Sequence, residues 1–422
     1  MKKITLSLCL CAAIASNVIA DKTVVEISYS YPKLFNEVHA TLEKEFEKKY
    51  PNIDVKVRAG SSSYEDETQK VLRQSITNKM PDVSFQGLNR FRIFADKKLA
   101  VDLNQFIKKD KSDLKEIGFD ESLYGAGTFG DKVYGVPFAV SLPIAYYNMD
   151  LVKKAGWDEK NLPKTWEEVV SLSKKVNALN EQNVKGMFFN WQISGNWFWQ
   201  ALNFSQGGTM LSQDEKKVAF DNKIGQWSMD TLKSFTQEAK MPFISKYSVA
   251  RTDFIAGNIA AYYTSTSDIK AVEDSIGDKF EMKTAIFPNI KENVGKLPAG
   301  GNGAVLLTRD PKKQKAAYEV IKFWCGPEGS KAVAKMTGYM PSNQVAAKEL
   351  TDEGFYKNNP NNATAVQELP YMTGWYAFPG KNSLKITEVI YDHMESIVSS
   401  DETNTKKVLK SMSKKVQKHL KR

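Results

Sequence analysis

The sequence predicts an α/β protein of two lobes, each with a sheet flanked by helices, joined by hinge segments. Strand-like and helix-like segments alternate after residue 23, which is typical of a parallel sheet with helices on both faces. The chain of 422 residues is long enough for two or three domains. Few Pro- or Gly-rich segments mark a boundary, so we expect the lobes to exchange segments through short hinges.

The spacing of apolar residues places each element along the chain. Runs or alternation of apolar residues predict strands at 24–29, 53–57, 82–85, 134–138, 144–147 and 259–263. Helical spacing predicts helices at 35–49, 65–78, 165–176, 225–239 and 311–325, and we expect mostly helical structure after residue 329. Thr165 and Glu168 form a predicted capping box, and Asp310 is the expected N-cap of the helix that begins at Pro311.

The first twenty residues have the pattern of a secretory signal peptide. Lys2 and Lys3 precede the apolar run Ile4–Ala15, which is too short to span a bilayer comfortably, and small residues lead up to Ala20. Residues 1–20 are therefore the predicted signal peptide of a periplasmic protein. No other long apolar run exists, which excludes a polytopic membrane protein. The mature chain would keep only Cys325, in an apolar segment that predicts burial.

The formal net charge of +10 could suggest a nucleic-acid partner, but the charge is unevenly distributed along the chain. Residues 406–422 hold eight Lys and Arg and no acid, and residues 21–405 hold equal numbers of acids and bases. We therefore expect no nucleic-acid partner. Apolar residues of this tail share one helical face, which predicts a docked amphipathic helix with a solvated basic face. Binding of an anionic surface or polyanion by this tail is the alternative.

The residues that most enzymes need are missing. The three histidines lie far apart in charged, helix-like segments, where we expect surface positions. No zinc-ligand spacing, phosphate-cradling Gly-rich loop or nucleophile elbow is present. We predict no catalytic residue, no metal and no cofactor, so the chain is not expected to be an enzyme. A secreted carbohydrate-active enzyme is the alternative.

Aromatic residues instead gather beside small and polar ones. Residues 191–204 carry three Trp and two Phe, interrupted by Gly195 and Asn196, and read as a helix or loop. Hydroxyl groups follow the apolar run that ends at Tyr263, and Gly300–Gly303 offers backbone donors. Aromatic faces stack on the C–H faces of sugars while polar groups bond sugar hydroxyls. The pattern indicates a sugar site, with simple core packing of the rings as the alternative.

Short motifs follow one another in order along nearly the whole mature chain. They are FEKKYP at 46–51, MPDV at 80–83, YGVPF at 134–138, YYNMD at 146–150, KKAGW at 153–157, PKTW at 163–166, FIAG at 254–257 and TGYMP at 337–341. On these motifs the chain resembles the family 1 extracellular solute-binding proteins of ATP-binding-cassette (ABC) importers. Residues 337–361 are most similar to members of the sugar and glycerol-3-phosphate-binding type.

The resemblance implies a two-lobe periplasmic-binding-protein fold of the type II-like class. We expect residues 21–138 and 268–330 to form the first, N-terminal lobe, and residues 139–267 and 331–422 the second, C-terminal lobe. The implied function is capture of a sugar or polyol in the periplasm by a monomer. The monomer would deliver its solute to an inner-membrane ABC permease with its ATPase.

The resemblance also implies a set of ligand-binding residues. These are Tyr64, Asn89, Ser141, Trp191, Trp197, Ser265, Ser267, Gly301, Tyr339 and Phe378. Members that bind glycerol 3-phosphate carry an acid where residues 86–89 offer only amides here, and an Arg in a final motif where Lys381 is the only cation. We therefore expect a neutral sugar or polyol. Glycerol 3-phosphate or a glycerophosphodiester is the alternative.

Overall fold

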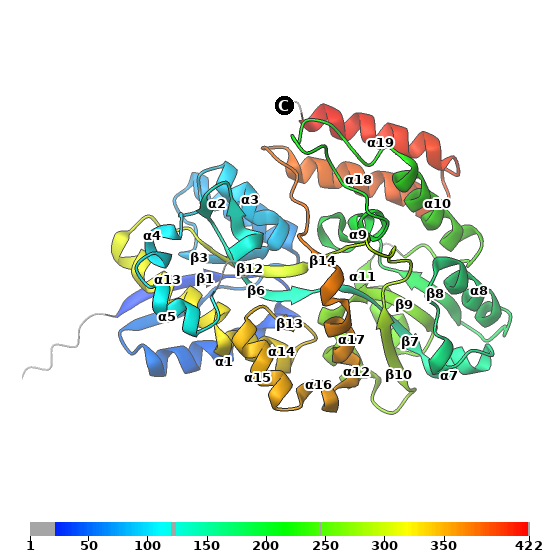
Figure 1. Ribbon diagram of the computed structural model, residues 1–422, viewed down its shortest axis with the longest axis horizontal. Helices are drawn as coiled ribbons and strands as arrows, with labels where there is room; N and C mark the ends of the chain where they lie inside the picture. The colour runs from blue at the N-terminus through cyan, green and yellow to red at the C-terminus, as the bar shows by residue number, and fades with distance from the viewer. Residues whose placement is uncertain (1–21, 120–123, 245, 421–422) are drawn as a thin grey trace, which may run out of the picture.

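Two sheets form the framework of the computed structural model, which describes residues 22–119, 124–244 and 246–420. The predicted signal peptide lies outside the described residues. Figure 1 shows two α/β units side by side, each built around one sheet and covered by helices. The predicted α/β fold with sheets flanked by helices is confirmed. No helix in the described ranges is long and apolar enough to cross a membrane.

The six-stranded sheet has the order β13-β6-β12-β3-β1-β2. Its strands are β1 (Thr23–Ser28), β2 (Ile53–Val57), β3 (Val83–Gly87), β6 (Val136–Ser141), β12 (Gly300–Leu306) and β13 (Met340–Pro341). The pairs of β1 with β2 and β3 are parallel, as the alternation of strands and helices predicts. The pairs of β12 with β3 and β6 are antiparallel.

The four-stranded sheet has the order β10-β7-β9-β8. Its strands are β7 (Pro143–Asn148), β8 (Lys185–Phe189), β9 (Ile259–Ser265) and β10 (Met282–Ile286). Two short pairs complete the strands: β4 (Thr128–Phe129) with β5 (Lys132–Val133), and β11 (Leu297–Pro298) with β14 (Met372–Thr373).

Helices of both units cover the sheets. Those of the six-stranded unit are α1 (Pro32–Lys49), α2 (Tyr64–Ile76), α3 (Phe91–Asp96), α4 (Asn104–Ile107), α5 (Lys111–Glu116), α13 (Pro311–Cys325), α14 (Pro327–Met336) and α15 (Gln344–Asp352). Those of the four-stranded unit are α7 (Met149–Lys154), α8 (Trp166–Asn177), α9 (Trp197–Ser205), α10 (Lys223–Gln237), α11 (Tyr247–Ile255), α12 (Ile269–Ile276), α16 (Phe355–Asn358), α17 (Pro360–Glu368), α18 (Ser383–Val398) and α19 (Thr405–Leu420). Short 3₁₀ helices are η1 (Leu88–Arg90), η2 (Gly125–Gly127), η3 (Glu159–Asn161), η4 (Ser194–Asn196), η5 (Thr266–Asp268) and η6 (Leu369–Tyr371).

Local sequence signals explain how several helices begin. Thr165 Oγ1 accepts from the Glu168 backbone N–H, and the Glu168 carboxylate accepts from the backbone N–H of Thr165, so the predicted capping box is present. Asp310 caps α13 through the Lys312 backbone N–H, and Pro311 occupies the first helical position. Cys325 ends this helix and is buried, as predicted.

The chain passes between the sheets at Leu142, the single residue between β6 and β7. It passes back between β10 and β12. The domain limits expected above stay a prediction, but the strand pairing differs from them at one element: β10 follows residue 268 and nevertheless pairs with β7 of the four-stranded sheet. The sequence between β9 and β12 carries no distinctive signal that shows where the chain leaves one sheet for the other.

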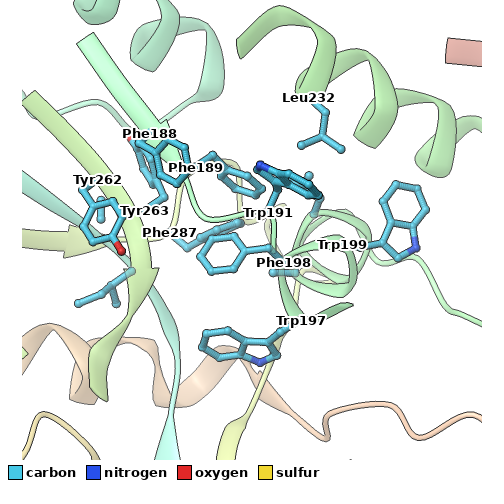
Figure 2. Packing of buried hydrophobic residues seen from close by; sticks show 14 of the residues in the cluster. Phe188, Phe189, Trp191, Trp197, Phe198, Trp199, Leu232, Tyr262, Tyr263 and Phe287 are labelled. Carbon is cyan, nitrogen blue, oxygen red and sulfur yellow. The ribbon is translucent and has the colours of Figure 1, made fainter. Parts of the chain in front are cut away.

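Each unit has an apolar core. In the four-stranded unit, Trp166 packs edge-on against Phe189, Phe235 and Phe287 at centroid distances of 5.7, 5.0 and 5.1 Å. Figure 2 shows part of this core, with aromatic rings from β8, β9 and α9 converging. Such edge-to-face pairs contribute beyond the area they bury.

Two histidines correct the expectation of surface positions, because His39 and His393 are buried. His39 lies on the apolar face of α1, and its Nδ1 accepts a hydrogen bond from Trp324 Nε1 at 3.0 Å. Burial lowers the pKa of His39 to about 3. The imidazole is therefore neutral, as its role of acceptor requires.

The C-terminal amphipathic helix is present as α19, whose apolar face is buried against α18 and α10. Figure 1 shows these three helices packed together at one end of the four-stranded unit. Lysines 406, 407, 410, 414, 415 and 418 are exposed. The docked arrangement with a solvated basic face is therefore observed.

We expect stability to fall at mildly acidic pH because of His39. An unfolded histidine has a pKa near 6.5 and the folded one about 3, so protons favour the unfolded chain below about pH 6.5. The free energy of unfolding should drop by about 2 kcal/mol between pH 7 and 5 from this group alone. Urea unfolding at both pH values measures the drop, and His39→Leu should remove that part of it. An equal drop in the variant would contradict the assignment.

We also expect Met412→Ala to destabilise the fold by about 2–5 kcal/mol, since Met412 is buried beneath α19 and its removal leaves a cavity. Lys414→Ala, on the exposed face of the same helix, should change stability by less than about 0.5 kcal/mol. Urea unfolding compares the two. Equal effects would mean that α19 is not docked in solution.

Candidate functional site

The ends of several strands meet where the two sheets approach each other. Register pairs Gly87 with Asn302 and Ser141 with Gly300, which brings the ends of β3 and β6 to the start of β12. Across the passage at Leu142, β9 ends at Ser265. Loops and side chains at such strand ends form the ligand sites of open α/β sheets.

A buried hydrogen-bond network joins three side chains at this junction. The Tyr64 and Tyr339 hydroxyl oxygens lie 3.2 Å apart, and Asn302 Nδ2 donates to the Tyr64 hydroxyl at 3.2 Å. Burial raises the pKa of both phenols, which therefore stay neutral. The nearby Ser267 side chain opposes this rise of the pKa of Tyr339. Neutral phenols donate and accept, so this network suits a ligand with hydroxyl groups.

Two amide oxygens at the junction have no partner. Asn89 Oδ1 and Asn302 Oδ1 are buried and accept no hydrogen bond from any described residue. An unpaired buried acceptor costs about 1–3 kcal/mol, so a donor supplied by a solute or a water molecule would stabilise this part of the structure. The two oxygens are acceptors, so a molecule that completes this site must donate hydrogen bonds to them.

Two tryptophans flank the network. Trp375 Nε1 donates to the Gly195 carbonyl at 3.2 Å, and its ring lies 6.3 Å from Tyr64 and 6.2 Å from Trp197. Trp197 Nε1 donates to the Pro298 carbonyl at 2.8 Å. A Cβ atom at Gly300 would lie 2.8 Å from both the Trp197 ring and Ser141 Oγ, so glycine is required there. We call Tyr64, Asn89, Trp197, Asn302, Tyr339 and Trp375 the site cluster.

The structure brings together some of the predicted site residues and separates others. Tyr64, Asn89, Ser141, Trp197, Ser267 and Tyr339 meet in or beside the site cluster. Gly301, in β12, has a φ of 110° and lies against the Ala139 carbonyl. Ser265 Oγ accepts from the Ser267 backbone N–H at 3.1 Å.

Two predicted residues lie elsewhere. Figure 2 shows Trp191 and Trp197 on opposite sides of Phe198, and Trp191 stacks on Phe243 at 6.2 Å. Phe378 packs edge-on against Tyr376 at 5.3 Å. Among the described residues, neither ring stacks on a member of the site cluster, although both belong to the same apolar core. All ten assignments as ligand contacts stay predictions.

The sequence analysis missed a charge pair beside the cluster, between the buried Arg90 and the partly buried Glu65. Arg90 Nη2 donates to Glu65 Oε1 at 2.6 Å, while Ser194 Oγ and the Gly195 backbone N–H donate to the same carboxylate at 2.6 and 2.8 Å. Burial would raise the pKa of Glu65, but Arg90 and these donors outweigh it and leave that pKa below its usual value. The pair makes this part of the site neutral overall. Lys381, the cation expected from the sequence, is exposed.

The position of the charge pair was open to prediction. Glu65 directly follows Tyr64, and Arg90 directly follows Asn89, both predicted site residues. Trp375 and Asn302 carried a weaker signal, as a tryptophan at a turn and a member of the glycine-rich segment 300–303. Only the fold shows that these segments meet.

Comparisons with known proteins agree on one family. The family of bacterial extracellular solute-binding proteins matches residues 41–364. The sn-glycerol-3-phosphate-binding periplasmic protein UgpB of Shigella flexneri is 24% identical over 313 residues, covering 68% of this chain and 70% of that protein.

Solved structures share the fold. UgpB from Mycobacterium tuberculosis, in complex with glycerophosphocholine, has a TM-score of 0.84 at 19% identity, covering 95% of this chain and 99% of that chain. The ABC substrate-binding protein Lmo0181 from Listeria monocytogenes, in complex with cycloalternan, has a TM-score of 0.81 at 21% identity, covering 94% and 99%.

We expect Gly195→Ala to destabilise the protein by about 1–2 kcal/mol. Gly195 has a φ of 67°, which an L-residue adopts at a cost of that size, and a Cβ there would lie 2.4 Å from Asn89 Nδ2 and from the Trp375 ring. Gly374→Ala is the control, since a Cβ there meets nothing within 4 Å. Thermal or urea unfolding compares them. Equal stability would mean that the junction is not closed as described.

Proposed function

Because the chain belongs to the bacterial extracellular solute-binding proteins, we propose that its site cluster binds a neutral sugar or another polyol. The family consists of substrate-binding proteins of ABC transporters and not of enzymes, so the chain is a solute-binding protein. The identity of the solute, its contacts and the route of delivery are the parts that we propose.

The unpaired oxygens of Asn89 and Asn302 carry the proposal. Both atoms are acceptors, so a solute that completes the site must donate hydrogen bonds to them. Sugar and polyol hydroxyls donate; the glycerol hydroxyls of glycerol 3-phosphate donate too, while its phosphate offers acceptors only, so these two oxygens call for a hydroxylated solute and the charge balance decides between the classes. The Trp197 and Trp375 rings supply apolar faces of the kind on which the C–H groups of sugars stack.

The charge balance supports the same solute class. Glu65 neutralises the buried Arg90, and the tyrosines beside them stay protonated. A neutral solute therefore enters without leaving a buried charge unpaired, which would be costly.

Glycerol 3-phosphate or a glycerophosphodiester is the second candidate. Arg90 Nε is buried and has no partner among the described residues, and such an N–H could donate to a phosphate. The named ligands of the UgpB proteins belong to this chemical class. The Arg90 guanidinium would then pair with two anions, the Glu65 carboxylate and the phosphate.

We further propose that the protein is a periplasmic monomer that closes its two lobes around the solute. Ser141, Asn89 and Tyr64 belong to the six-stranded unit, while Trp197 and Trp375 come from the four-stranded one, so a solute in the cluster touches both. Only a solute that contacts both lobes favours the closed arrangement. The closed form would be recognised by an inner-membrane ABC permease with its ATPase.

A thermal-shift screen of residues 21–422 tests the proposal. The compounds are neutral mono- and oligosaccharides, glycerol and other polyols, sn-glycerol 3-phosphate and glycerophosphocholine. We expect at least one neutral compound to stabilise the protein, by about 2.7 kcal/mol at a concentration of 100 Kd. Stabilisation by phosphate compounds alone would favour the second candidate. Stabilisation by none, or cleavage of any compound, would contradict both.

We expect Asn302→Ala to weaken binding of a neutral compound found in that screen by about 1–3 kcal/mol, since one acceptor and the bond to Tyr64 are lost. Asn52→Ala, at an exposed position, is the control and should leave affinity unchanged. Calorimetry measures both. Unchanged affinity in Asn302→Ala would place the solute elsewhere.

Trp197→Ala should weaken binding by a similar amount, about 1–3 kcal/mol, if its ring stacks on the solute. Trp191→Phe keeps an aromatic ring in the core and distinguishes the two tryptophans. An equal loss in Trp191→Phe would bring Trp191 into the site, and no loss in either would contradict a tryptophan contact.

A further inference from the structure

We propose that Arg92, Glu215 and Tyr376 form a clasp that raises affinity for every solute by holding the two lobes closed. The proposal rests on the proposed function, in which closure traps the solute. It assigns a role in binding to three residues outside the site cluster.

The clasp joins the two units directly. Arg92 lies in α3 of the six-stranded unit, and Glu215 lies between α9 and α10 of the four-stranded unit. Arg92 Nη1 and Nη2 each donate to one oxygen of the Glu215 carboxylate, both at 2.6 Å. The Tyr376 hydroxyl donates to Glu215 Oε1 at 3.0 Å. Bidentate Arg–carboxylate pairs are the strongest and most directional ion pairs.

Partial burial makes this pair stronger than an ordinary surface pair. The side chains of Arg92 and Glu215 are 22% and 33% exposed. Many other pairs, such as Lys174 with Glu238 at 52% and 56%, are far more open to water. Screening weakens exposed pairs, so most of them contribute little.

The surroundings of Arg92 and Glu215 hold both residues in place. Phe91 and Phe94, on either side of Arg92, are fully buried and fix α3. Glu215 has a φ of 56°, in the left-handed region, and its turn is closed by the bond from its backbone N–H to the Ser212 carbonyl at 2.8 Å. Strained backbone of this kind persists where the surroundings hold it and is frequent at functional positions.

A second contact of α3 reinforces the clasp. Asp96 Oδ2 accepts from the Gly380 backbone N–H at 3.2 Å and lies 3.7 Å from Arg92 Nε. Tyr376 and Gly380 therefore bring the segment between β14 and α18 against α3 at two points. Figure 1 shows this segment running from the junction of the units toward α18.

Arg92 and Glu215 lie outside the site cluster, while Tyr376 directly follows its member Trp375. Among the described residues, neither Arg92 nor Glu215 hydrogen-bonds Tyr64, Asn302 or Tyr339. Glu65 also crosses between the units, through Ser194 and Gly195, but it lies beside Tyr64 and cannot be changed without affecting the site. The clasp can be tested on its own.

Because Arg92 and Glu215 lie outside the site cluster, we expect them to act on affinity through closure of the lobes. When only the closed form holds the solute, apparent affinity is proportional to the fraction of protein that can close. Loss of the clasp lowers that fraction by one factor, whatever the solute. Loss of a residue that contacts the solute changes affinity by a factor that depends on the solute.

Arg92→Ala and Tyr376→Phe test the clasp in the full mature chain, with Lys174→Ala as control. Calorimetry with two different neutral compounds from the screen gives Kd, and stopped flow gives the dissociation rate. We expect Arg92→Ala to raise Kd by about 5–30-fold, equally for both compounds and mainly through faster dissociation. Tyr376→Phe should give a smaller common factor, and Lys174→Ala none. Glu215→Ala is measured alone and combined with Arg92→Ala; the double variant should raise Kd by about as much as Arg92→Ala alone, because both changes remove the same ion pair.

An unchanged Kd in Arg92→Ala would overturn the proposal, and so would factors that differ between the two compounds or a double variant whose loss is the product of the two single losses. Small-angle scattering of the unliganded proteins separates the clasp from the proposed function. If wild type binds no solute, the proposed function fails, while a larger radius of gyration in Arg92→Ala than in wild type still supports the clasp. Equal radii in that case would overturn it as well.

Discussion

The passage of the chain at Leu142 is the constraint on which the rest of the structure depends. One residue separates β6 of the first sheet from β7 of the second, and its backbone is fixed on both sides: the Thr266 backbone N–H donates to its carbonyl at 3.0 Å, and its own N–H donates to Thr266 Oγ1 at 3.3 Å. The ends of strands from both sheets are thereby kept close together. Ser141 lies just before this passage and Ser265 and Ser267 lie on either side of Thr266, so polar groups from distant parts of the sequence collect at one junction.

In the proposed function, the junction selects a solute by hydrogen bonding and not by net charge. Its one buried cation, among the residues described, is Arg90, and Glu65 occupies it. What is left to a solute is a set of neutral donors and acceptors, with tryptophan rings beside them. Solved structures with a similar fold hold ligands as different as glycerophosphocholine and cycloalternan. The fold fixes where a solute goes, and a few side chains decide which solute it is.

Local signals in the sequence predicted the elements well because each rests on neighbouring residues. The capping box at Thr165, the start of α13 at Pro311 and the two faces of α19 all follow from spacings of a few residues. Tertiary features were less accessible. His39 looked exposed among charges, yet its position on the apolar face of α1 puts it against Trp324. The sheet to which β10 belongs, and the meeting of Trp375 with Gly195, depend on contacts between segments far apart in the chain, which no local pattern encodes.

The C-terminal helix α19 supports the turn that carries Glu215, although it lies at the far end of the chain. The Gln417 side chain accepts from the Val218 backbone N–H at 2.9 Å and donates to the Lys216 carbonyl at 2.8 Å, so it fixes the turn directly after Glu215. Trimming of the C-terminus by a protease at Lys414 or Lys415 would remove this support while sparing every residue that touches the solute. If the clasp acts as proposed, a protein shortened in that way would keep its selectivity and release its solute sooner.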